Sequence, residues 1–174
     1  MQQLIKAGGK KLIFATDKDG QSALYCASLH DRVEAARLLI EAGGKKLLLI
    51  MTDCNGSSAL HAAAAKGHVG SMRQLIEAGG MELMLLRDKN EQTALHGATD
   101  KGHEAAARML IKAGGKELLF NGFSPLHTAA YYGHVDVSRL LVERGGKRLL
   151  AAKTNQGNTA EDVATWRGHG ALAV

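Results

Sequence analysis

The stretch Ser58–Gly80, SALHAAAAKGHVGSMRQLIEAGG, decides the fold because the chain repeats it, with variation, on both sides. The same frame opens at Ser22, Thr93, Ser124 and Thr159, so that successive copies begin 36, 35, 31 and 35 residues apart. A regular period of this length is typical of a stacked array of repeats in which each unit contacts only its neighbours. We therefore expect one elongated solenoid without a central core.

Each copy predicts two helices joined at a glycine. Ser58 or its equivalent supplies a side-chain oxygen that can cap the first, alanine-rich helix, and Gly67 or its equivalent can adopt the positive φ that ends it. A longer second helix then runs to a glycine pair such as Gly79–Gly80. Its apolar stripe is too broad for a free surface helix, so each second helix needs neighbours on both sides.

The motifs of these copies resemble the ankyrin repeat. They are Ser-Pro-Leu-His at 124–127, Gly-His at 133–134 and Leu-Leu at 140–141, while the other copies keep Ala-Leu-His or Ala-Leu-Tyr and so replace the usual proline by alanine. The resemblance covers nearly the whole chain. It implies an all-α solenoid of stacked helix-turn-helix units, with β-hairpin or extended fingers between the units and a concave face that binds partners.

We expect a single ankyrin-repeat domain over residues 1–174. Half repeats at 1–9 and 159–174 would flank helix pairs at 22–44, 58–80, 93–115 and 124–146. The apolar runs after the glycine pairs, such as 47–51, predict an added helical turn packed beneath the second helix. Neither end shows the polar outer face of a terminal unit, which leaves two alternatives: a fragment of a longer array, or an array whose ends fit against something else, as a monomer or by end-to-end association.

The fourth connection departs from the pattern. Gly115 and Ser124 are only nine residues apart, whereas the other connections span 13 or 14 residues. The finger there must be short or distorted. A true deletion and residues missing from the sequence both stay open as explanations.

Composition favours an intracellular, cytoplasmic protein. No apolar run approaches the roughly 20 residues that span a bilayer, and the opening residues lack the apolar core of a secretion signal. Cys26 and Cys54 are the two cysteines; a single disulfide is the alternative to the reduced state that we expect. We expect no membrane partner.

Histidines recur seven residues apart, which on one straight helix would indicate a metal site. Glycine interrupts each pair, and Tyr25 and Asp162 replace the first histidine in two units, so a structural role is the better interpretation. The resemblance implies that the first histidine bonds within its turn and that the second helps join the helices. The pairs are His61 with His68, His96 with His103, and His127 with His134.

No acid, base and nucleophile converge in the pattern, so we expect neither catalysis nor a cofactor nor a metal. Cys26 falls in an apolar helix, where a cysteine is normally inert packing. Gly-Gly-Lys occurs four times but lacks the strand-loop-helix order and the Ser or Thr of a phosphate loop. We interpret its glycines as helix ends and its lysines as neighbours of the negative end of the helix dipole.

The stretches after the glycine pairs account for the formal net charge of +5. They contain seven basic and two acidic residues, whereas basic and acidic residues are equal in number on the expected concave side. This basic ladder predicts helix capping and solubility, with a phosphorylated or nucleic-acid ligand as the alternative; we do not expect nucleic acid as the partner. The ladder comprises Lys10, Lys11, Lys45, Lys46, Lys116, Lys147 and Arg148, against Glu82 and Glu117.

The resemblance places the last two residues before each central glycine on the concave side. They form two columns whose members become neighbours in space. One column is Leu29, Ala65, Asp100, Tyr131 and Trp166, and the other is His30, Lys66, Lys101, Tyr132 and Arg167. We expect these columns to bind a protein partner.

Aromatic residues concentrate at the later end of the columns. We expect Tyr131 beside Trp166 and Arg167 over the ring of Tyr132, and Phe123 joins the group. Tyr, Trp and Arg dominate the binding energy of many interfaces. The alternative is that the rings cover the exposed end of the stack.

Overall fold

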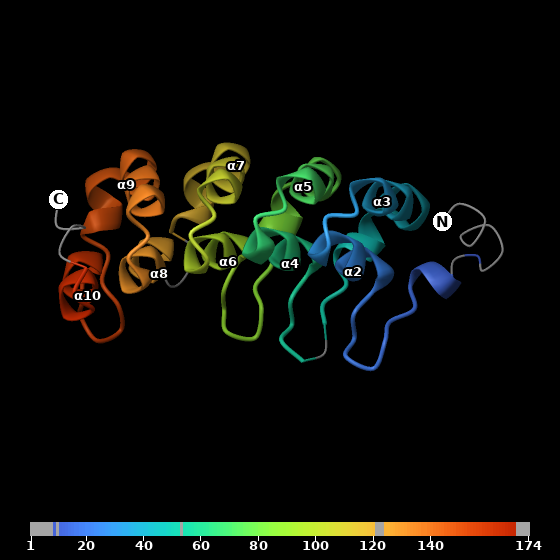
Figure 1. Ribbon diagram of the computed structural model, residues 1–174, viewed down its shortest axis with the longest axis horizontal. Coiled ribbons are helices and arrows are strands. Elements are labelled where there is room, and N and C mark those ends of the chain that lie inside the picture. Colours follow the sequence, from blue (N-terminus) through green and yellow to red (C-terminus); the bar gives the residue numbers. More distant parts are fainter. Residues whose placement is uncertain (1–8, 10, 53, 121–123, 170–174) are drawn as a thin grey trace.

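The structure, a computed structural model, describes residues 9, 11–52, 54–120 and 124–169, in which short and long helices alternate (Figure 1). The short first helices are α2 (Ala23–Leu29), α4 (Ala59–Lys66), α6 (Ala94–Asp100), α8 (Pro125–Tyr132) and α10 (Ala160–Trp166). The second helices are α3 (Val33–Leu48), α5 (Val69–Met84), α7 (Glu104–Gly114) and α9 (Val135–Leu150). Figure 1 shows the second helices in an upper row, the first helices beneath them and the fingers projecting below.

Helix pairs stack side by side, as expected. Each first helix contacts the first helix of the next unit, from α2 to α10, and the second helices α3, α5, α7 and α9 contact one another in the same order. The buried leucines repeat with the units: Leu24, Leu60 and Leu95 are fully buried and Leu126 is 3% exposed. The core is therefore a continuous row between units, and the expected solenoid is confirmed.

The first helices begin at the predicted caps. Ser58 Oγ accepts a hydrogen bond from His61 N at 3.4 Å, and Thr159 Oγ1 accepts one from Asp162 N at 3.2 Å. Ser124 precedes Pro125, which occupies the first helical position, where its missing N–H has no partner inside the helix in any case. Local chemistry thus determines where each unit starts.

The glycine pairs kink α3, α5 and α9, which corrects the prediction that they end these helices, whereas α7 ends at Gly114 with Gly115 as its C-cap, as predicted. Gly44, with φ 59° and ψ −159°, lies in a backbone region that only glycine adopts readily. One further helical turn follows, and it buries Leu47 and Leu48 at 1% exposure each. A Cβ on Gly43 would lie 2.8 Å from Leu47 Cβ, so the first glycine of the pair leaves room for this turn. The predicted added turn is confirmed.

The central glycines serve the contact between units as well as the turn. Gly67 has φ 69°, and a Cβ there would lie 2.9 Å from the ring of His103 in the next unit. In the first unit Asp31 occupies this place with φ 50°, and its Oδ1 accepts hydrogen bonds from the backbone N and Oγ of Ser71, at 2.9 and 2.8 Å. A side chain here is thus tolerated where it bonds to the neighbouring unit.

The described fingers are extended loops, which is one of the two forms that the sequence predicts for them. Within the described residues, one isolated bridge joins Thr16 and Ser22, and no longer ladder forms. A backbone hydrogen bond closes each loop, as between Asp88 N and Gln92 O at 2.9 Å and between Thr154 N and Asn158 O at 2.9 Å. We call residues 15–21, 51–57, 87–92 and 152–158 the first, second, third and fifth fingers.

The fourth connection begins with a 3-10 helix, η1 (Gly115–Leu118), and buries Leu118 and Leu119 completely. Residues 121–123, where we predict a short or distorted finger, lie outside the described part. The predictions for the chain ends concern residues 1–8 and 170–174, which lie outside it as well. Over the described residues, no helix combines the length and the apolarity needed to cross a membrane.

Cys26 and Cys54 are free in this structure, Cys54 being exposed and Cys26 half-buried. Burial raises the pKa of the Cys26 thiol, and the nearby Asp17 carboxylate adds to the increase. A raised pKa leaves less of the reactive thiolate at neutral pH. Cys26 is thus less buried than the sequence suggests, but its thiol has the low reactivity that we expect of a cysteine in a packed helix.

Two glycine-to-alanine changes should have opposite effects on stability, one at the kink of α5 and one inside α6. Gly80→Ala should lower the free energy of unfolding by about 1–3 kcal/mol, because the backbone at φ 57° and ψ −152° is strained for alanine although the space around it is open. Gly97→Ala, inside α6 with its Cβ 3.4 Å from Ala65 Cβ, should raise it by about 0.5–1 kcal/mol. Urea unfolding measures both changes. Unchanged stability in Gly80→Ala would contradict the assigned kink.

Candidate functional site

The two predicted columns lie at the ends of the first helices, in neighbouring units. The second column, His30, Lys66, Lys101, Tyr132 and Arg167, is exposed throughout. The first column is half-buried at Leu29, Ala65, Asp100 and Tyr131 and exposed at Trp166. Phe123 lies outside the described residues. The structure therefore places all the other predicted residues on the surface of the stack.

Aromatic side chains gather where α8 meets α10. The ring centroids of Tyr131 and Trp166 lie 6.4 Å apart, which confirms that they are neighbours. Tyr131 and Tyr132 meet edge to face at 5.0 Å, and Tyr132 stacks on His134 at 6.1 Å. We call Tyr131, Tyr132 and Trp166 the aromatic cluster.

Arg167 covers Tyr131 and not Tyr132, which corrects the prediction. Its guanidinium carbon lies 4.2 Å from the centroid of Tyr131 and 5.8 Å from that of Trp166. Tyr132 instead stacks on His134 and hydrogen-bonds to Asp100, so its ring is turned toward the preceding unit. The face of Tyr131 is the one that remains for Arg167.

Asp100 connects the two columns. Its Oδ2 lies 2.8 Å from Lys101 Nζ, and this contact raises the pKa of the Lys101 ammonium. The Tyr132 hydroxyl donates to the same carboxylate, which raises the pKa of Tyr132. Both partners therefore keep their protons at neutral pH, and the three side chains hold one another in place at the surface.

A pocket of about 750 Å³ opens beside the aromatic cluster. Tyr131, Tyr132, Trp166 and Asp100 are among the residues that line it. Thus four of the predicted residues line one hollow, whereas Leu29, His30, Lys66, Lys101 and Arg167 are not part of its lining. Pockets of this volume are typical of ligand and peptide side-chain sites.

The sequence interpretation missed several residues that line the pocket. The third finger contributes Gln92, the fifth finger contributes 154–156 and Asn158, and α10 contributes Asp162 and Val163. The short fourth connection is the signal that could have found them, because fewer residues between two fingers leave space between them.

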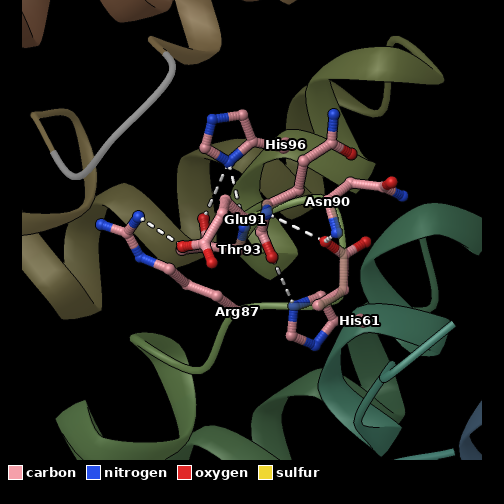
Figure 2. Close-up of polar contacts among 8 residues, drawn as sticks. His61, Arg87, Asn90, Glu91, Thr93 and His96 are labelled. Carbon is pink, nitrogen blue, oxygen red and sulfur yellow. Dashed lines mark hydrogen bonds and ion pairs between the residues drawn. The ribbon is translucent and has the colours of Figure 1, made fainter. Parts of the chain in front are cut away.

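The first histidines tie each turn to the next finger. His61 Nδ1 lies 2.8 Å from Ser58 Oγ, and its Nε2 lies 3.0 Å from the backbone oxygen of Gln92 (Figure 2). His127 repeats the second contact with the backbone oxygen of Asn158 at 3.0 Å. Figure 2 shows His96 bonded to Thr93, the cap of its own helix, with Nδ1 of His96 3.1 Å from the backbone nitrogen of Thr93. The implied bond within the turn is confirmed.

The second histidines join neighbouring units. Nε2 of His68 lies 3.1 Å from the Leu29 carbonyl oxygen, and Nε2 of His134 lies 2.9 Å from that of Asp100. Nε2 of His61, His68, His127 and His134 therefore contacts a backbone carbonyl oxygen in each case. In the part of the chain that the structure describes, no group of three or more His, Cys, Asp or Glu side chains is arranged to hold a metal ion.

Two family models match the chain. A model described as ankyrin repeats (3 copies) matches residues 45–119, and a model described as ankyrin repeat matches residues 121–159. Together these segments cover more than half of the chain. Comparison with curated proteins gives no match.

The buried first histidines predict a loss of stability in mild acid. Burial lowers the pKa of His61 and of His127, so the folded chain keeps them neutral when the unfolded chain, with a pKa of about 6.5, already binds protons. The free energy of unfolding should therefore fall as the pH decreases from 7 toward 5. Urea unfolding across this range measures the slope.

His61→Gln should make this pH dependence shallower, because one of the two groups is removed. His30→Gln changes an exposed position and serves as the comparison, with the wild-type dependence expected. An equal slope of unfolding free energy against pH in the wild type and in His61→Gln would contradict the role assigned to the buried ring.

Proposed function

Because this chain belongs to the ankyrin-repeat family, we propose that it is a non-catalytic protein-interaction module whose partner docks on the two columns. Ankyrin repeats generally mediate protein–protein interactions. The proposal adds the location: the finger side of the first helices, centred on the aromatic cluster between α8 and α10. It also includes an intracellular setting, which the two free cysteines support.

The observation that carries the proposal is the exposure of the aromatic cluster. Trp166 is 76% exposed and Tyr132 is 48% exposed. Large aromatic side chains that cover the end of a stack would be buried by it, so their exposure favours partner binding over end-packing. Trp and Tyr with an adjacent Arg are the residue types that contribute most at interfaces.

The cluster is also held in position before a partner arrives. Arg167 stacks on Tyr131, an arrangement worth about 0.5–1 kcal/mol at an exposed site. Tyr132 is held by Asp100 and His134. Side chains that are already ordered lose less conformational entropy on binding, which favours affinity.

The basic ladder is a weaker candidate for the docking surface. Lys45 forms an ion pair with Glu82 of the next unit, and the Arg148 guanidinium lies 4.4 Å from the centroid of Phe120. Two ladder members thus contact their own chain. A phosphorylated or nucleic-acid ligand along this edge would show steep salt dependence of binding.

Truncating the cluster should weaken partner binding by about 2 kcal/mol per ring, or roughly thirtyfold in Kd, for Tyr131→Ala and Trp166→Ala. The measurement is capture of proteins from the source cell on the immobilised chain, followed by titration of the captured protein. Thermal melting of each variant measures stability.

The matched control is Arg73→Ala with Glu77→Ala on the exposed side of α5, which should leave capture unchanged. Trp166→Ala should barely move the melting temperature because its ring is mostly exposed. Capture that survives both ring truncations would refute the proposed surface. Loss of binding that tracks a large loss of stability would assign the rings to the scaffold.

A further inference from the structure

The fourth connection has too few residues to form a finger like the others. After η1, Leu119 is buried and Phe120 packs against the core, and only three residues separate Phe120 from the cap Ser124. A chain of three residues spans about 10 Å at most, whereas the other fingers must go out and return over six or seven residues. By residue count, the segment before α8 is therefore shorter than the other fingers.

The pocket of about 750 Å³ lies against α8. Its described lining includes Gln92 of the third finger, residues of the fifth finger, the aromatic cluster and Val163. The third and fifth fingers are not successive fingers of the array. Figure 1 shows the fingers before α4 and α6 next to each other, with the finger before α10 set apart from them beyond α8.

We propose that this pocket binds an extended segment of the protein partner that inserts an arginine or lysine side chain between the third and fifth fingers. The inference rests on the proposed function, because it names the chemistry of the segment that docks beside the aromatic cluster. Shape and charge support it independently.

The shape argument comes from the array itself. Where two fingers are successive, extended backbones lie against each other: Lys89 N of the third finger donates to Asn55 O of the second at 3.0 Å. A partner segment in the pocket would lie near Gln92 of the third finger and near the fifth finger, which are both extended loops. The uncharged polar side chains there, Gln92, Thr154 and Asn158, suit the N–H and C=O groups of a peptide backbone.

The charge argument comes from the lining. Among the lining residues that the structure describes, the charged members are two carboxylates, Asp100 and Asp162, and none is a lysine or arginine, although the whole chain has a formal net charge of +5. Hydrogen bonds from Thr159 lower the pKa of Asp162, with a smaller contribution from Lys153, so this carboxylate stays ionised. Lys101 already pairs with Asp100, which leaves Asp162 as the stronger attraction for a cation.

The aromatic cluster adds to this preference for a cationic side chain. The faces of tyrosine and tryptophan rings attract cations, and the methylene stem of lysine or arginine packs along apolar surface while its charged end reaches a carboxylate. Arg167 shows this contact within the chain, at 4.2 Å from the centroid of Tyr131. An acidic side chain would meet carboxylates and ring faces and would be repelled by both.

The experiment pans phage-displayed random nonapeptides on the full chain and then measures the selected peptides by fluorescence anisotropy. We expect enrichment of arginine or lysine next to apolar residues. Net charge does not explain such a result, because a chain of charge +5 repels basic peptides overall. Peptides without enriched basic residues, or no enrichment at all, would overturn the inference.

Charge variants of the fifth finger test the location. Gln156 lines the pocket, and Asn90 is its counterpart in the third finger, exposed and outside the lining. Gln156→Lys should weaken the selected peptides by about three- to tenfold and Gln156→Glu should strengthen them by a similar factor, at low salt. Asn90→Lys should change their Kd by less than about twofold. Equal effects of the two lysine variants would overturn the pocket as the site.

The two proposals fail in different ways. Partner capture that is lost in Trp166→Ala but unchanged in Gln156→Lys leaves the docking surface standing and overturns the pocket. Capture that is unchanged in Trp166→Ala overturns the proposed function. Thermal melting of the Gln156 variants should match the wild type, since position 156 is exposed in a finger.

Discussion

The rest of the structure depends on the contact between a histidine ring and the end of the preceding first helix. The carbonyls at the end of a helix have no partner inside it, and between stacked units water is largely excluded. The ring nitrogens of His68, His134 and His169 meet such carbonyls at 3.1, 2.9 and 3.2 Å. His103, His134 and His169 also lie close over the central glycines Gly67, Gly102 and Gly133, where a Cβ would come within 2.7–2.9 Å of the ring. In the first unit Asp31 stands at this place, so the contact between units does not require glycine everywhere.

The same contact positions the candidate surface. The carbonyls that accept these bonds belong to Leu29, Asp100 and Tyr131, which are members of the first column. The backbones of Leu29, Asp100 and Tyr131 are thus bound to the next unit through their carbonyl oxygens. The stack uses these backbone atoms and the proposed partner binding would use the side chains, which allows the side chains to vary without disturbing the stack.

Much of the fold follows from the sequence because its signals are local. Ser58 caps a helix through its own hydroxyl, and the backbone of Gly44 lies in a region that only glycine adopts readily. The prediction that Arg167 covers the ring of Tyr132 is wrong because the position of the guanidinium depends on contacts from other units. Asp100 and His134 hold Tyr132, so the face of Tyr131 is the one left for the guanidinium. The sequence did not predict that α3, α5 and α9 continue past a kink for a related reason. The turn after Gly44 is stable only through the burial of Leu47 and Leu48, which is a tertiary contact.

By itself the sequence determined the repeat, the register of the units and the residues of the two columns, because period, caps and glycines act over a few residues. Only the tertiary structure decided that Asp100, Tyr131, Trp166 and the fifth finger surround one pocket. These groups come from three units. The space between them depends on the length of the fourth connection and on how closely the histidine contacts hold neighbouring units together. Distances of that kind arise from packing, which no single stretch of sequence contains.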